Sequence, residues 1–173
     1  MRYLTYISLA AVVLTVLACT APPAEPKIIA TLDGPLKHFE QGVEYWEAEQ
    51  YEDAILEFSE AVRFDANYAD AYYNRGNSYA KLGQHQTAIN DYTEAIRLNP
   101  DNYSAYLNRG NSYNVLEEYQ TAIEVYTEAI QLGPNDFRAY FNRGISYTKL
   151  GRHSLADADF AKACSLDSEY CNN

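Results

Sequence analysis

Residues 74–79 read NRGNSY, and residues 108–113 repeat the same six letters. Residues 142–147 carry a third copy with one change, NRGISY. The glycines of the three copies stand 34 residues apart, and Gly42 precedes them by the same interval. A fixed period of this length is typical of chains built from stacked units, each of which buries its apolar face against its neighbours. The phrase therefore predicts a repeat architecture.

Other positions around the glycine keep the same period, and the residues at each position share a size or a chemical class. Glycine and alanine suit places where two helices cross closely, and aromatic rings fill the spaces between units. Apolar residues recur at helical intervals from Ala88 to Ile96, which indicates helices rather than strands. Turn signals follow at Gly83, Asn99-Pro100 and Gly133-Pro134. The columns are Gly42, Gly76, Gly110, Gly144; Tyr45, Tyr79, Tyr113, Tyr147; Ala54, Ala88, Ala122, Ala156; Phe58, Tyr92, Tyr126, Phe160; and Ala61, Ala95, Ala129, Ala163.

These columns resemble the tetratricopeptide repeat family, whose unit is a 34-residue pair of antiparallel helices. The resemblance implies an all-α fold, an α-solenoid of four tandem helix-turn-helix repeats in a right-handed superhelical array. We expect the repeats at residues 35–68, 69–102, 103–136 and 137–170, followed by a tail at 171–173. The first and last repeats lack the closing proline of the middle two, and no amphipathic capping helix follows the fourth.

The N-terminus has the pattern of a secretory signal peptide over residues 1–18, with Arg2 followed by an uncharged apolar run. Residues 16–19, VLAC, resemble the bacterial lipobox, although Leu17 replaces the small residue commonest there. This resemblance implies that Cys19 is acylated, and that the protein is lipid-anchored outside the cytoplasm, on the periplasmic side or at the outer membrane. The alternative is an ordinary signal peptide cut after Ala21 and a soluble secreted or periplasmic protein. Residues 19–34, which contain three prolines, are expected to form a linker.

The charge balance argues against nucleic acid as a partner. The chain has 24 acidic and 13 basic residues, a formal net charge of −11 and a sequence pI near 4.6. A surface of this sign repels phosphates and anionic lipids.

Two cysteines remain after Cys19, at Cys164 and Cys171. Outside the cytoplasm an even remainder favours a disulfide, and a turn after Leu166 would bring the pair within bonding distance. Such a bond would replace the missing capping helix as a staple. Two free thiols, with Cys164 filling a small packing position, are the alternative.

In the tetratricopeptide repeat family the first helix of each hairpin lines a concave groove, and the resemblance suggests which side chains face it here. Carboxamides carry donors and acceptors that pair with the backbone of an extended peptide, and an aromatic row offers apolar pockets. Alternatively, the asparagines bond to water or to a neighbouring helix while the aromatic rings pack. Arg75, Arg109 and Arg143 are expected to pack over the hairpins, near helix carboxylates. The candidate peptide-binding residues are Phe39, Tyr73, Asn74, Asn77, Leu107, Asn108, Asn111, Arg138, Phe141 and Asn142.

Signs of catalysis are scarce. His38, His85 and His153 lack metal-ligand spacing, and no glycine-rich phosphate loop occurs. We expect no enzyme activity, cofactor or metal. The sequence favours a non-catalytic adaptor that binds an extended peptide or protein segment. A self-associating structural scaffold of the cell envelope, with an unused groove and homo-oligomeric assembly, is the alternative.

Overall fold

A computed structural model describes residues 28–171, and over this range the chain forms eight α-helices and one short 3₁₀ helix, with no strand. This confirms the predicted all-α solenoid. Connections of three or four residues join the helices, as expected for antiparallel neighbours. The helices are α1 Ile28–Glu47, α2 Tyr51–Phe64, α3 Ala69–Lys81, α4 His85–Leu98, α5 Tyr103–Val115, α6 Tyr119–Leu132, α7 Phe137–Lys149 and α8 His153–Leu166, with η1 at Ser168–Tyr170.

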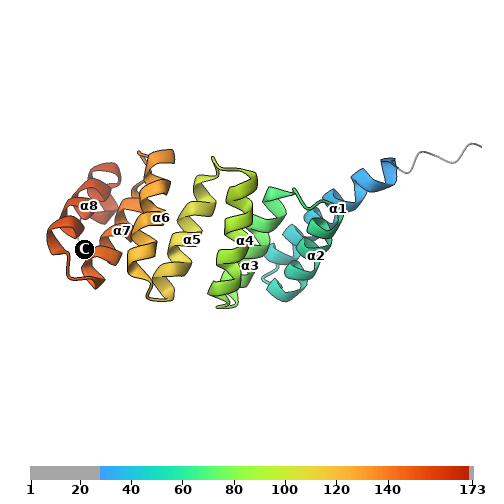
Figure 1. Ribbon diagram of the computed structural model, residues 1–173, viewed down its shortest axis with the longest axis horizontal. Helices are drawn as coiled ribbons and strands as arrows, with labels where there is room; N and C mark the ends of the chain where they lie inside the picture. The colour runs from blue at the N-terminus through green and yellow to red at the C-terminus, as the bar shows by residue number, and fades with distance from the viewer. Residues whose placement is uncertain (1–27, 172–173) are drawn as a thin grey trace, which may run out of the picture.

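The helices stand in a row in chain order, with α1 and α8 at opposite ends (Figure 1). Each helix packs against the next one along the chain, and each odd-numbered helix also contacts the next odd-numbered helix. Even-numbered helices do not contact one another within residues 28–171. The array is therefore more closely packed on its odd-numbered side, and α1, α3, α5 and α7 form the inner, concave face.

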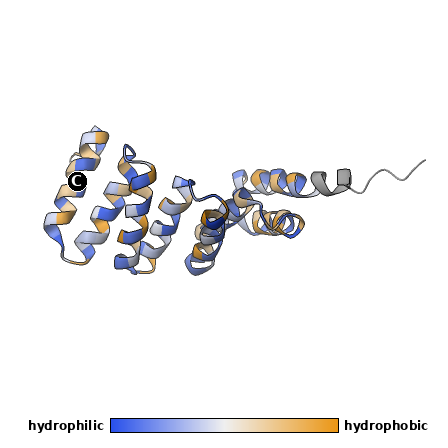
Figure 2. Ribbon diagram, turned by 45° about the horizontal axis from the view of Figure 1, so that its top comes forward, coloured by the Kyte–Doolittle hydropathy of each residue, from blue (hydrophilic) through white to orange (hydrophobic). Residues whose placement is uncertain are grey.

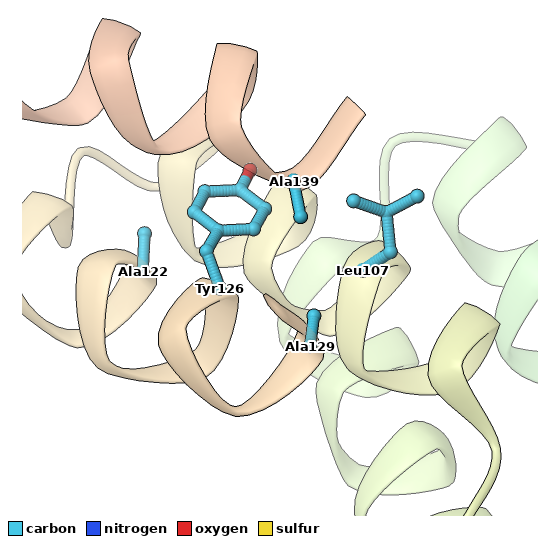
Figure 3. Close-up of a cluster of buried hydrophobic side chains, with 5 residues drawn as sticks. All are labelled: Leu107, Ala122, Tyr126, Ala129 and Ala139. Atoms are coloured by element: carbon cyan, nitrogen blue, oxygen red, sulfur yellow. The ribbon is translucent and has the colours of Figure 1, made fainter. Parts of the chain in front are cut away.

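Apolar and polar residues alternate around the helices, in keeping with amphipathic helices that pack on their apolar faces (Figure 2). The core consists mainly of alanines and of the aromatic column on the even-numbered helices. Figure 3 shows one cluster, in which the Tyr126 ring extends from α6 with Ala122 and Ala139 close by. A Cβ atom added at Gly110 would lie 2.5 Å from Cε1 of Tyr126. The glycine of the NRG phrase is needed because this ring occupies the space of a side chain.

The turn inside each hairpin has one residue with left-handed backbone geometry. Gly83 (φ 75°) and Gly151 (φ 71°) occupy it in the second and fourth hairpins, whereas Glu49 (φ 59°) and Glu117 (φ 62°) occupy it in the first and third. The residue that follows donates its N–H back to the tyrosine column, for example Glu118 N to Tyr113 O at 2.9 Å. This hydrogen bond caps the C-terminus of the odd-numbered helix, and the left-handed residue that it requires is usually glycine.

The first helix is longer than the sequence predicted. The linker was expected over residues 19–34, but α1 already begins at Ile28 and contains Pro35 within it. Residues 28–33 include neither glycine nor proline, so no breaker stops the helix there. Pro35 is the eighth residue of α1, beyond the first turn, and it removes one backbone hydrogen bond from the helix interior. The signal peptide, Cys19 and residues 172–173 lie outside the described residues.

The end of the last hairpin is closed by a disulfide between Cys164 and Cys171, whose Cα atoms lie 4.6 Å apart. The turn between them is η1, where the Asp167 side chain accepts the N–H of Glu169 at 3.1 Å. The structure thus pairs the two cysteines as the sequence predicted, and free thiols are not observed at these positions.

Candidate functional site

Three adjoining hollows lie along the concave face, with volumes of about 360, 290 and 290 Å³. Asn111 on α5 lines all three, so together they form one groove. Hollow I lies toward α1 and α3, and hollows II and III lie between α5 and α7. Hollow I includes Trp46, Tyr73, Asn77, Lys81, His85 and Val115. Hollow II includes Asn114, Val115, Tyr119, Asn142 and Ile145, and hollow III includes Leu107, Asn108, Arg138, Phe141 and Asn142.

Two asparagines form the centres of a hydrogen-bond network between repeats. The Asn77 Oδ1 atom accepts from the Tyr92 hydroxyl at 2.9 Å and from Asn108 Nδ2 at 2.9 Å. One repeat later, Asn111 Oδ1 accepts from the hydroxyl of Tyr126 at 2.8 Å and from Nδ2 of Asn142 at 2.8 Å. Each centre thus bonds to the even-numbered helix of its own repeat and to the odd-numbered helix of the next.

Burial raises the pKa of the Tyr92 and Tyr126 hydroxyls, so both stay protonated and act as donors. The alternative that the asparagines bond to a neighbouring helix is therefore correct for one polar group of each amide. The opposite group of each amide stays free. Within residues 28–171, no partner occurs for Nδ2 of Asn77 and Asn111 or for Oδ1 of Asn108 and Asn142.

The first and last repeats lack a central asparagine of this kind, and they also lack the tyrosine that would donate to it. Val43 and Ile145 replace the central asparagine, and Phe58 and Phe160 replace the tyrosine that would donate to it. The sequence shows that repeats with a central asparagine have a tyrosine and that repeats with an aliphatic residue have a phenylalanine. Only the structure shows that these two positions contact each other across the hairpin. Asn74 has no asparagine in the preceding repeat to bond to, because Val43 stands there. It donates instead to the Asp70 carbonyl of its own helix at 2.8 Å. Asn74 lines none of the three hollows.

The predicted aromatic row packs mainly inside its own repeats. Its rings contact the aromatic column of the even-numbered helices, with centroids 5.7 Å apart for Phe39 and Phe58 and 6.1 Å for Tyr73 and Tyr92. Leu107 is only 4% exposed and belongs to the core cluster of Figure 3. Tyr73, Leu107 and Phe141 still reach the groove wall, whereas Phe39 lines none of the three hollows.

The arginine column behaves as predicted in two of its three members. Arg75 forms an ion pair with Asp91 at 2.7 Å, and Arg143 forms one with Asp159 at 2.8 Å, with both carboxylates buried. The hydrogen bonds that Arg75 donates to the Asp91 carboxylate are the main cause of the raised pKa of Arg75. These arginines fix the hairpins and do not line the hollows.

Arg109 differs from the other two because Val125 stands where they have an aspartate. Its Nη1 atom donates to Thr93 Oγ1 at 3.3 Å, and its Nε atom is shielded from solvent without a partner. Burial lowers the pKa of this guanidinium. Arg109 is therefore a half-buried cation that forms no ion pair among the described residues, with Glu128 acting on it only by Coulomb attraction.

Arg138, the one cation among the predicted binding residues, is already engaged. Its guanidinium donates to both carboxylate oxygens of Asp136, the shortest contact being 2.6 Å. This hydrogen bond is the main cause of the raised pKa of Arg138 and of the lowered pKa of Asp136. Arg138 lies on the wall of hollow III, but a ligand carboxylate there would compete with Asp136.

Trp46, Lys81, His85 and Val115 line the groove and were not among the predicted binding residues. They stand near the C-terminal ends of odd-numbered helices or at the start of α4, and their identities vary from repeat to repeat. Repetition therefore gave no signal for them. Within residues 28–171 no cluster of three or more His, Cys, Asp or Glu side chains could hold a metal ion, and no helix there has the length and apolar character to cross a membrane.

Comparison with known families identifies the repeats. Models described as tetratricopeptide repeat match residues 69–102, 91–124 and 137–170, and a model described as TPR repeat matches residues 42–83 and 110–151. Each of these models describes a repeat, and none describes an enzyme. No curated protein matches the sequence.

Solved structures share the same fold. The MamA protein is 28% identical with a TM-score of 0.75, covering 83% of this chain and 79% of its own. The first TPR domain of Spaghetti (RPAP3), bound to the HSP90 peptide SRMEEVD, is 25% identical with a TM-score of 0.67, covering 69% and 94%. MamA from Desulfovibrio magneticus RS-1, at 23% identity and a TM-score of 0.74 over 78% and 76% of the two chains, shows the fold alone.

The repeat period, the stacked hairpins and the family matches from residue 42 to residue 170 agree. The chain belongs to the tetratricopeptide repeat family.

Proposed function

We propose that the protein is a non-catalytic adaptor that holds an extended segment of a partner protein in the groove formed by α1, α3, α5 and α7. The observation that carries this proposal is the set of free amide groups along the groove. Asn77 and Asn111 have free Nδ2 donors, and Asn108 and Asn142 have free Oδ1 acceptors, within the described residues.

An extended peptide has the complementary chemistry, because its backbone presents N–H and C=O groups in regular alternation. Pairing with the backbone would hold the segment whatever its side chains, and the hollows between the amides would receive alternate side chains. The inter-repeat bonds fix the asparagine side chains before a ligand arrives. Such preorganisation lowers the entropy cost of binding.

The structural relatives support the proposal at the level of the fold. The first TPR domain of RPAP3, 25% identical to this chain, was solved with a bound peptide. A peptide in a groove of this type is therefore physically reasonable.

We further propose that Cys19 carries a lipid anchor and that the repeats lie outside the cytoplasm in a bacterial envelope. The lipobox-like VLAC sequence supports the anchor, and the Cys164–Cys171 disulfide fits an oxidising compartment. Metabolic labelling with palmitate tests this. We expect label on the parent chain and none on Cys19→Ser, and equal labelling of the two would contradict the anchor.

A photo-crosslinking amino acid at position 115 tests the groove. Val115 is 59% exposed and lines hollows I and II, whereas Leu56 on α2 is 65% exposed and lines none of the three hollows, so position 56 is the matched control. We expect discrete adducts with a partner from position 115 and none of the same mass from position 56. Equal adducts from both positions would contradict the proposal.

The crosslinked peptide, once mapped by mass spectrometry, gives a direct binding assay. A synthetic peptide of that segment should bind the parent chain, and Val115→Glu should weaken it at least fivefold because a charge would enter an apolar contact. Leu56→Glu should leave the affinity unchanged. Adducts between two copies of this chain would instead support the structural-scaffold alternative.

A further inference from the structure

Hollow I contains an indole and an imidazole, which hollows II and III lack. Trp46 Nε1 and His85 Nδ1 are both shielded from solvent, and neither has a hydrogen-bond partner within the described residues. Both residues line hollow I, together with Lys81, which is exposed and forms no ion pair in the part of the chain that the structure describes. Three nitrogen-bearing side chains without partners therefore share one hollow.

The chemistry of these groups points to an acceptor. An indole N–H and a lysine ammonium only donate hydrogen bonds, and a histidine ring donates from at least one nitrogen. Buried polar atoms without partners are uncommon in folded proteins and call for an explanation. The indole is also peculiar to this end of the groove, because Ala80, Asn114 and Thr148 stand at the equivalent position of the other repeats.

We infer that hollow I is a subsite for the carboxylate side chain of an Asp or Glu residue within the bound segment. This inference rests on the proposed groove function and adds the side-chain chemistry that one part of the groove selects. The volume of about 360 Å³ admits such a side chain beside Trp46, His85 and Lys81. Because the two ring nitrogens are shielded from solvent, binding requires the Trp46 and His85 rings to turn them toward the carboxylate. The methylene groups of a glutamate would pack on Trp46 and on the exposed Val115.

Local charge favours the carboxylate although the whole chain carries −11. Charges more distant than the Debye length, about 8 Å at physiological ionic strength, are largely screened, so the ammonium of Lys81 dominates near the hollow. Arg138, at the other end of the groove, is held by Asp136 and offers no equivalent free cation. Lys149 on the wall of hollow II is an exposed lysine as well, but hollow II has no indole or imidazole beside it, so the combination of donors is found in hollow I.

The single tryptophan of the chain provides the readout. We would titrate the ¹⁵N-labelled full-length protein in detergent with three peptides and follow the indole N–H signal of Trp46. The probes are acetyl-Ala-Ala-Glu-Ala-Ala-amide, the same peptide with Gln for Glu, and acetyl-tetra-alanine with a free C-terminal carboxylate. We expect the Glu peptide to shift the indole signal and to bind at least fivefold more tightly than either of the others.

Two variants test the named groups. Lys81→Met should weaken the Glu peptide at least fivefold, and Lys37→Met, an exposed lysine on α1 outside the hollows, should not change it. His85→Tyr should weaken it as well, because the tyrosine hydroxyl lies farther from the ring than the histidine nitrogen. Tyr51 and Tyr119 occupy the equivalent position, so this change suits the fold, and His153→Tyr is its control.

Each outcome decides the inference. Equal binding of the Gln peptide, or no shift of the indole signal with any probe, would overturn the carboxylate subsite. Tighter binding of the free-carboxylate peptide would assign the hollow to a chain terminus and would also overturn it. Crosslinked adducts from position 115, combined with an unchanged Trp46 indole N–H signal, would support the adaptor function and contradict the carboxylate subsite.

Discussion

At the scale of single residues, the tyrosine and asparagine pairs show how one hydroxyl and one amide join two repeats. Asn77 Oδ1 receives one hydrogen bond from its own hairpin and one from the next. Removing this acceptor leaves the buried Tyr92 hydroxyl without a partner, whereas Asn108 Nδ2 keeps a hydrogen bond to the Tyr73 hydroxyl at 3.2 Å. The first and last repeats avoid that loss by changing both members of the pair, to Val43 with Phe58 and to Ile145 with Phe160.

We therefore predict that Asn77→Val lowers the free energy of unfolding by about 1–3 kcal/mol, because the Tyr92 hydroxyl becomes an unsatisfied buried group. Adding Tyr92→Phe should recover part of this loss, since the double variant reproduces the Val–Phe pair of the first repeat. Urea denaturation of both single variants and the double variant measures the coupling. Additive losses would contradict the hydrogen bond as the link.

Arg109 provides a second test at this scale, because its hairpin lacks the aspartate of the other two. We predict that Val125→Asp raises the free energy of unfolding by about 1 kcal/mol. Removing the buried valine costs about 1.5 kcal/mol, but the new carboxylate would pair with a half-buried cation whose Nε atom has no partner. The control is Val125→Asn, because asparagine has nearly the same shape as aspartate but no charge. This variant should be less stable than the parent chain. A Val125→Asp variant no more stable than Val125→Asn would contradict the prediction.

At the scale of the helical hairpin, the turn residue decides how each odd-numbered helix ends. The four hairpins use the same backbone geometry, but only Gly83 and Gly151 adopt it without steric cost. Glu49 and Glu117 hold a left-handed conformation that a side chain disfavours. The closing hydrogen bond forms in either case, as Gln50 N to Tyr45 O at 2.9 Å and Gln84 N to Tyr79 O at 2.9 Å show.

We predict that Glu117→Gly raises the free energy of unfolding by about 0.5–1 kcal/mol, the relief of left-handed strain less the extra chain entropy of glycine. For a chain of this size the melting temperature should rise by about 2–4 °C for each kcal/mol. The control is the opposite change, Gly83→Ala, which places a side chain at a left-handed position and should lower the melting temperature. Circular dichroism at 222 nm follows both variants. An unchanged or lower melting temperature for Glu117→Gly would mean that the glutamate is held by contacts that offset its strain.

At the scale of the whole molecule, the contacts between odd-numbered helices make the array concave on the side that carries the groove. The two ends of the array are chemically different. Ile89 and Ile123 on α4 and α6 are only 3% and 5% exposed because the next hairpin covers them. On α8 the equivalent residue is Asp157, which is exposed. A charge at this position opposes the stacking of another hairpin onto α8, because burying it without a partner is costly.

We predict that Asp157→Ile causes the protein to self-associate through the outer face of α8. The change would place an uncovered apolar residue at the position where the second and third hairpins have a buried isoleucine. Sedimentation velocity of the variant and the parent under identical conditions measures the association state. Asp157→Asn removes the charge without adding apolar surface and should behave as the parent does. Association of the parent through this face would support the scaffold alternative.

Much of the fold followed from the sequence because its determinants are local. The period of 34 residues, the helical spacing of apolar residues and the glycines of the turns act within one hairpin and predicted the helices and their order. The paired cysteines were also predicted, since only seven residues separate them. The linker prediction was wrong over residues 28–34, because α1 begins at Ile28 and continues through Pro35.

The sequence by itself therefore determined that this protein is a row of helical hairpins with asparagines on the first helix of its middle and last repeats. Only the tertiary structure decided what those asparagines do, because Asn77 meets Tyr92 across a sequence separation of 15 and Asn108 across one of 31. It also decided that Arg109 lacks a carboxylate, that Arg138 is occupied and that Trp46, Lys81 and His85 share one hollow. Contacts of this kind arise from the stacking of whole repeats, and no local pattern in the chain encodes them.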